Sequence, residues 1–149
     1  MLKLVKYTEV YLEYSWSWLN DPEIKELTAT PDFTKEDQLR FYNVLKEKEG
    51  YHIYGIEINS IEAGACGLKK VKEGRAEYWG YLGEKKFWGK GFGKMILDNI
   101  QALAIVKGIY CLYLEVGKEN IRAQNLYLKC GFSIIEQKCN SLIMEKHLN

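Results

Sequence analysis

The period of the apolar residues changes at Gly50, and this change limits what the chain can fold into. Before Gly50, apolar residues recur every three or four positions, which is the period of a helix packed on one side. After it, three runs of strand-like sequence follow one another, separated by turn residues at 59–60 and 72–74. These runs cover residues 51–58, 61–71 and 75–82. The simplest structure is an antiparallel meander preceded by helices.

The segments around the meander predict the other elements. A strand is expected at residues 2–7, followed by a helix from Thr8, its expected cap, to about Leu19. A short helical stretch follows over residues 22–27, and Thr34 with Asp37 has the spacing of a capping box for the next helix. Helices at 94–107 and 120–130 and strands at 110–116, 133–136 and 141–145 complete the chain. The order β-α-α-β-β-β-α-β-α-β-β predicts an α/β (α+β) fold with four helices.

Length and composition favour one domain over residues 1–149. The chain is 47% hydrophobic, which is enough for one core, and it contains no repeat or linker. Its 21 Lys and Arg against 20 Asp and Glu leave a net charge of +1, too little to attract nucleic acid or an anionic membrane. With no secretory signal and no run of about 20 apolar residues, a soluble cytoplasmic protein is expected.

The four cysteines are far apart, and no Cys-x-x-Cys pair or neighbouring histidine gives the spacing of a metal site. No metal is therefore expected. Cys66, Cys111 and Cys130 stand in apolar surroundings, which predicts buried free thiols in a reducing compartment.

A glycine-rich turn leads from the third strand of the meander into the next helix. Gly89, Gly91 and Gly93 alternate within the segment Trp88–Lys94, so that successive backbone N–H groups converge without a Cβ between them. With the positive end of the helix dipole, these N–H groups suit a diphosphate, and nearby lysines add positive charge. The lysines are Lys85, Lys86, Lys90 and Lys94. On the turn alone, a purely structural role stays open.

Two common phosphate loops do not fit this turn. In a Walker A motif the lysine is followed by Ser or Thr, whereas Lys94 is followed by Met95. A dinucleotide fingerprint has the spacing GxGxxG after the first strand of a parallel unit, whereas here the spacing is GxGxG after a meander. A simple nucleotide-binding module is therefore disfavoured.

A second group of residues lies on the helix after the next strand. If Asn120 opens that helix, Ala123 and Tyr127 follow on the same face. This segment, ending in Gly131-Phe132, resembles the motif N-x-x-A-x-x-x-Y-x-x-x-G-F of the Gcn5-related N-acetyltransferase (GNAT) superfamily. The glycine turn resembles the superfamily's [RQ]-x-x-G-x-[GA] motif at Gly91 and Gly93.

The resemblance spans essentially the whole chain and implies a GNAT fold, with a central mixed, mostly antiparallel sheet of about seven strands flanked by four helices. It implies acetyl-coenzyme A as co-substrate, bound by the turn and by the opposite helix wall. The implied cofactor-binding residues are Tyr81, Leu82, Gly83, Trp88, Gly89, Lys90, Gly91, Phe92, Gly93, Lys94, Asn120, Ala123 and Tyr127.

Trp88 departs from the superfamily pattern, which has Arg or Gln at this position. The segment Trp88–Gly91, together with Trp18–Pro22, resembles the branch that contains ribosomal-protein N-terminal acetyltransferases. That branch also acts on polyamines, antibiotics and amino-sugar nucleotides, so the acceptor stays open.

In this superfamily an amine attacks the thioester directly, which requires an oxyanion donor, an acid for the sulfur and a base. The resemblance assigns the oxyanion donor to backbone N–H groups near Tyr81, Leu82 and Gly83. Tyr127 is the candidate acid, because a phenol with a pKa of about 10 is protonated at neutral pH.

The base is less constrained. Glu77 is the first choice by family position and Glu115 the second, but a register shift by one residue would turn Tyr78 to the cleft instead of Glu77. His52 and His147 are weaker candidates.

An acceptor pocket is expected among the first helices, where aromatic residues and an acid are concentrated, although core packing explains most of them as well. The residues are Trp16, Trp18, Asp21, Phe33 and Tyr42. The leading hypothesis is an N-acetyltransferase that modifies a primary amine of a small molecule, for example an amino sugar nucleotide, as a monomer or homodimer. The alternatives are a protein N-terminal or lysine acetyltransferase and a non-catalytic acyl-coenzyme A sensor.

Overall fold

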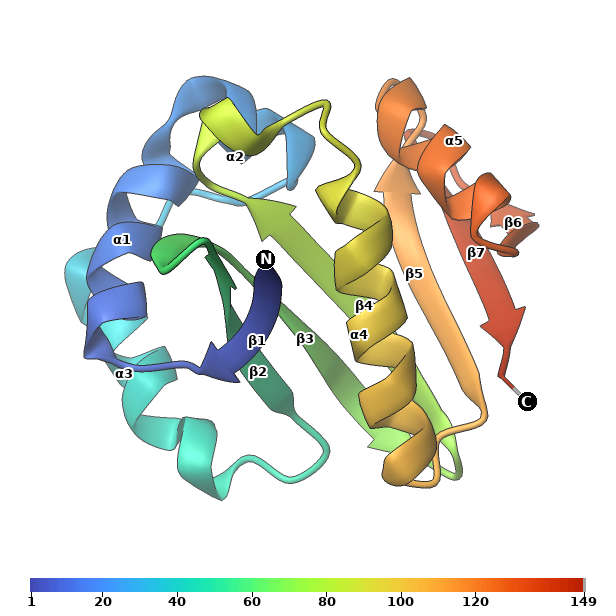
Figure 1. Ribbon diagram of the computed structural model, residues 1–149, viewed down its shortest axis with the longest axis horizontal. Helices are drawn as coiled ribbons and strands as arrows, with labels where there is room; N and C mark the ends of the chain where they lie inside the picture. Colours follow the sequence, from blue (N-terminus) through green and yellow to red (C-terminus); the bar gives the residue numbers. More distant parts are fainter. Residues whose placement is uncertain (149) are drawn as a thin grey trace.

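The strands expected from the alternating runs form one sheet of seven strands in the order β1-β2-β3-β4-β5-β7-β6 (Figure 1). The computed structural model describes residues 1–148. Neighbouring strands are antiparallel except for β4 and β5, which are parallel. The strands are β1 (Leu2–Lys6), β2 (His52–Ile58), β3 (Ile61–Lys72), β4 (Arg75–Leu82), β5 (Cys111–Gly117), β6 (Ser133–Gln137) and β7 (Ser141–His147). The predicted fold class is confirmed.

The helices follow the predicted order with one addition. They are α1 (Glu9–Asn20), α2 (Pro22–Leu27), α3 (Lys35–Val44), α4 (Phe92–Val106) and α5 (Ile121–Lys129). The short stretch at 22–27 is a separate helix, so residues 1–148 contain five α-helices where four flanking helices were expected. Its start is well marked, because the Asp21 side chain accepts hydrogen bonds from the N–H groups of Glu23 and Ile24. Pro22 adds a φ angle already suited to a first helical residue.

The two expected N-caps near the N-terminus have different outcomes. Thr34 and Asp37 form the capping box: Asp37 N–H donates to Thr34 Oγ1 at 3.0 Å, and Thr34 N–H donates to Asp37 Oδ2 at 2.9 Å. Thr8 stands at the N-cap position of α1, but its side chain makes no capping hydrogen bond. The expected position of Thr8 is therefore confirmed, but its side chain does not satisfy the first N–H groups of α1.

Each face of the sheet has its own apolar cluster, because successive strand residues point to opposite sides. On one face, Trp79 and Tyr81 of β4 pack with Tyr11 and Trp18 of α1. On the other, Tyr78 packs with residues of α4 and α5, and Figure 1 shows α4 lying in front of the sheet beside β4 and β5. The parity of a β4 residue thus decides which helices it meets.

All four cysteines are free thiols. Cys66 and Cys111 are buried as expected, whereas Cys130 is partly exposed at the end of α5. Within residues 1–148, none of the helices is long and apolar enough to cross a membrane.

Candidate active site

The parallel strands β4 and β5 pair only where they begin. Residues 75–77 of β4 are in register with residues 111–113 of β5. Both strands then continue, β4 to Leu82 and β5 to Gly117, and in the described part of the chain no further pairing joins them. The sheet therefore opens toward the C-terminal ends of these two strands, where backbone groups lack a neighbouring strand.

The register with β3 decides which backbone groups of β4 face this opening. Gly83 N–H donates to the Ala63 carbonyl of β3 at 2.8 Å. Because alternate residues of a strand direct their N–H and C=O groups to opposite sides, Tyr81 also bonds toward β3 while Leu82 and Gly80 face β5. Among the residues expected at this position, Leu82 is the one whose N–H faces the opening.

The glycine turn presents its backbone N–H groups at the start of α4. Gly89 and Gly91 have φ angles of 72° and 84°, which residues with a Cβ rarely adopt. Gly91 is the N-cap of α4 and no side chain caps that helix, so the N–H groups of its first turn are open to an anion. Phe92 and Gly93 belong to that first turn, because α4 begins two residues before the expected Lys94.

Gly93 serves a different purpose from the other two glycines of the turn. A Cβ at this position would lie 2.8 Å from Cδ2 of Leu126 in α5. The absence of a side chain therefore lets the start of α4 approach α5. At the start of α5, the Asn120 side chain caps the helix. Its Oδ1 accepts a hydrogen bond of 3.3 Å from Ala123 N–H. The two sequence motifs are thus joined in space.

Two of the four lysines near the turn form ion pairs with acidic side chains. Lys85 Nζ lies 2.9 Å from Asp21 and 3.1 Å from Glu23, and Lys94 Nζ lies 2.9 Å from Asp98. The charges of Lys85 and Lys94 are therefore balanced by neighbouring acids.

Tyr127 of α5 lies against β4 on the face shared with α4. Its ring meets that of Tyr78 edge to face at 6.4 Å and that of Phe132 at 5.8 Å. Burial raises the pKa of Tyr127 to about 12, so its phenol keeps its proton at neutral pH. Tyr78 is itself buried, and burial raises its pKa well above the ordinary value.

The register thus resolves the alternative left open for β4: Tyr78, and not Glu77, lies beside Tyr127. From the sequence, Tyr78 was expected only as the residue that a register shift would turn to the cleft, and no chemical role was expected for it. In the sequence, uncharged residues alternate at Ala76, Tyr78 and Gly80. This alternation indicates that Tyr78 lies on a covered face of the strand.

Glu77 and Glu115 lie together on the opposite face, lining one cavity of about 320 Å³ with Tyr113. Glu77 lies 3.2 Å from Lys70, and Glu115 accepts a hydrogen bond of 2.6 Å from Ser141 Oγ. The structure therefore brings the two candidate bases to the same place, near the point where β4 and β5 separate.

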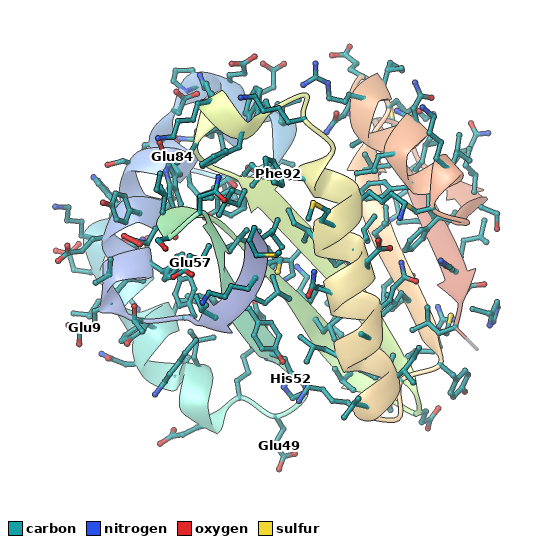
Figure 2. All side chains as sticks on the ribbon, viewed as in Figure 1. Glu9, Glu49, His52, Glu57, Glu84 and Phe92 are labelled. Carbon is teal, nitrogen blue, oxygen red and sulfur yellow. The ribbon has the colours of Figure 1, made fainter. Side chains whose placement is uncertain are left out.

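The two histidines lie far from the opening between β4 and β5. His147 is in register with Cys111 at the beginning of β5, the end at which the strands pair. Figure 2 shows His52 at the opposite end of the molecule from Phe92 and Glu84, which mark the turn. Neither histidine is positioned to act on a group bound at the turn.

One group of possible metal ligands occurs in the described residues, formed by Cys111, Glu145 and His147. Arg75 already donates to this group, with Nη1 at 2.7 Å from Glu145 Oε2 and 3.1 Å from Cys111 Sγ. A fixed positive charge therefore stands where a metal ion would have to bind.

The residues expected to form an acceptor pocket are mostly used in packing. Trp18 is buried and its indole N–H donates to Glu84 at 2.7 Å, while Asp21 caps α2. Trp16 meets Phe33 edge to face, and the Lys35 amine lies 5.3 Å from the Trp16 ring. Tyr42 joins the cluster around α1 instead.

The site therefore combines an opened pair of parallel strands, an uncapped helix start and a protonated phenol. The sequence profile of the acetyltransferase (GNAT) family matches residues 10–132. The chain belongs to this family. It is accordingly an N-acetyltransferase.

Solved structures share the fold over nearly their full length. A spermidine N-acetyltransferase from Vibrio cholerae in complex with CoA and spermine superposes with a TM-score of 0.90 at 18% identity, covering 98% of this chain and 95% of that one. An aminoglycoside acetyltransferase in complex with coenzyme A gives 0.84 at 20% identity, covering 99% and 95%. A domain from Methanocaldococcus jannaschii gives 0.87 at 19% identity, covering 99% of both chains. No curated protein matches by sequence.

Proposed function

We propose that this N-acetyltransferase modifies a primary amine of a small molecule by direct attack within a ternary complex. The observation that carries this proposal is the separation of β4 from β5 between the uncapped start of α4 and Tyr127. Two structural neighbours act on small polyamines or aminoglycosides, which supports an acceptor of that size. An amino sugar nucleotide belongs to the same chemical class and stays among the acceptors to test.

The glycine turn binds the diphosphate of acetyl-coenzyme A through the N–H groups of residues 89–94. Positive φ angles at Gly89 and Gly91 orient these groups, and the dipole of α4 favours the negative charge. The thioester then lies between β4 and β5, where Leu82 N–H donates to its carbonyl oxygen.

The amine nitrogen forms a bond to the thioester carbon, and the negative charge on oxygen is stabilised by the Leu82 N–H. Collapse of this species breaks the C–S bond. Tyr127 donates its proton to the leaving sulfur; the phenol carries this proton at neutral pH, since burial raises its pKa to about 12.

The proton lost by the amine passes through water to a carboxylate in the cavity of Glu77 and Glu115. Glu77 is the first choice, because it stands on β4 at the last residue paired with β5. A cytoplasmic location is part of the proposal, supported by four free cysteines.

A thiol-release assay with acetyl-coenzyme A and panels of polyamines, aminoglycosides, amino sugars and peptides tests the proposal. Release with a small amine and not with peptides supports it. Release with peptides alone contradicts the small-molecule acceptor. Tight binding without release for any amine contradicts catalysis and identifies a sensor.

A further inference from the structure

Trp88 occupies the position where the family motif has Arg or Gln, and its side chain turns away from the phosphate-binding turn. The indole Nε1–H donates to the Leu82 carbonyl oxygen at 3.0 Å. The ring packs with the cluster beneath α1. A side chain held in this way does not extend toward a diphosphate, so it does not take over the role of an arginine.

The accepting carbonyl is that of Leu82, the residue of β4 whose backbone groups face the opening between β4 and β5. In a strand the N–H and C=O of one residue point to the same side, and Gly83 N–H fixes the alternation by donating to Ala63 of β3. On the side of β5, Leu82 has no strand partner in the described chain. The indole therefore supplies the hydrogen bond that a neighbouring strand provides elsewhere in the sheet.

Neighbouring residues restrict both partners of the hydrogen bond between Trp88 and Leu82. Gly83 lies so close to the Trp18 ring that a Cβ there would be 2.1 Å from its nearest atom. The Trp18 indole donates to Glu84, the residue after Gly83, at 2.7 Å. On the other side of Trp88, the Lys85 amine lies 5.8 Å from the ring centroid while it pairs with Asp21.

From these contacts we infer that Trp88 is a positioning residue for catalysis. Its indole N–H orients the Leu82 peptide and thereby joins the diphosphate-binding turn to the N–H that donates to the thioester carbonyl. The inference rests on the proposed function of Leu82 as oxyanion donor. It predicts that Trp88 acts on the reacting group more than on the affinity for coenzyme A.

Steady-state kinetics of the full chain provide the first test. Trp88→Phe keeps a ring and removes the donor, and we expect kcat to fall about 10-fold, since a misplacement of about 1 Å costs up to about 10²-fold. The Kd for coenzyme A is expected to change less than about 3-fold, because Trp88 makes no predicted contact to phosphate. Trp88→Gln returns a donor and should recover part of kcat.

Tyr110→Phe is the control, because Tyr110 is exposed and lies just before β5, at the end where β4 and β5 pair. It should leave kcat and Kd unchanged. A Trp88→Phe enzyme with weakened coenzyme A binding and normal kcat would make Trp88 a binding residue and overturn the inference. Unchanged kcat and Kd would overturn it as well.

A second readout needs no amine acceptor and so separates this inference from the proposed function. The ¹³C resonance of the carbonyl in bound acetyl-coenzyme A should move downfield from its position in free solution, because the Leu82 N–H polarises the carbonyl. In Trp88→Phe it should return toward the free value, and in Trp88→Gln it should recover. A resonance that is the same in Trp88→Phe and the natural sequence would refute the positioning role even if no amine proves to be a substrate.

Discussion

Tyr127 shows at the level of one residue how burial fixes the protonation state of a side chain. Its ring lies between α5 and Tyr78 of β4, and loss of water around the phenol raises its pKa to about 12. A proton held this firmly at neutral pH is still available to a thiolate as it forms, because the developing charge on sulfur strengthens the hydrogen bond.

Replacing Tyr127 with Phe should lower kcat by about 10²-fold, the lower end of the usual range for loss of a general acid. The Kd for acetyl-coenzyme A should stay within a few-fold, because ring packing is retained. Thiol release under saturating acetyl-coenzyme A measures the first quantity and calorimetry the second. Full turnover in this variant would remove Tyr127 from the reaction.

The raised pKa of Tyr127 also predicts how the free energy of unfolding falls at alkaline pH. An unfolded tyrosine loses its proton near pH 10, whereas Tyr127 in the fold keeps its proton until about pH 12. The free energy of unfolding contributed by this group is therefore present below pH 10 and is lost as the pH rises to about 12. Urea titrations across this range should show a smaller decline for Tyr127→Phe than for the natural sequence; equal declines would contradict the burial argument.

The two candidate bases can be separated by paired substitutions. Glu77→Gln should lower kcat/KM for the amine by about 10²-fold, since general bases contribute on this scale. Glu115→Gln, which lies in the same cavity and keeps a polar group beside Ser141, serves as the matched comparison. A larger effect for Glu115→Gln would exchange the two assignments.

Among the elements, the turn before α4 depends most on backbone conformation. Gly91 has a φ of 84° and open space where a Cβ would stand, so Gly91→Ala is strained without a clash. We expect it to cost about 1 kcal/mol of stability and to raise the KM for acetyl-coenzyme A, because the N–H groups of the turn reorient.

Gly108, after α4, matches Gly91 in conformation, with a φ of 79° and equally open space. Gly108→Ala should therefore lose similar stability while leaving the KM for acetyl-coenzyme A unchanged. Thermal unfolding and initial rates measure the two effects. Equal KM values for the two variants would argue that the turn does not bind the cofactor.

Elements that are specified by neighbouring residues were predicted correctly from the sequence. The capping box of Thr34 and the turns of the meander are specified by neighbouring residues, and Asn59 and Ser60 have the positive φ angles of a tight hairpin. The face presented by Glu77 and Tyr78 was left open, because it depends on pairing with β3 and β5, which are distant in the chain. The bond from Trp88 to Leu82 likewise depends on how the turn folds back on its own strand.

At the scale of the whole molecule, the site exists because one parallel pair interrupts an otherwise antiparallel sheet. α4 connects β4 to β5, and the two strands part after three paired positions on each side. Tyr127 packs against one face of the sheet, whereas Glu77 and Glu115 line a cavity on the other. Separation of the acid from the base by the sheet fits a reaction in which acyl donor and amine enter from opposite faces.

A crystal structure of the chain with coenzyme A is the most direct test of this account. We expect the diphosphate on the N–H groups of residues 89–94 and the sulfur between β4 and β5, within hydrogen-bonding distance of Tyr127 Oη. In an acetylated analogue, the carbonyl oxygen should accept from Leu82 N–H. A diphosphate bound away from the turn, or a sulfur outside the opening between β4 and β5, would contradict the account.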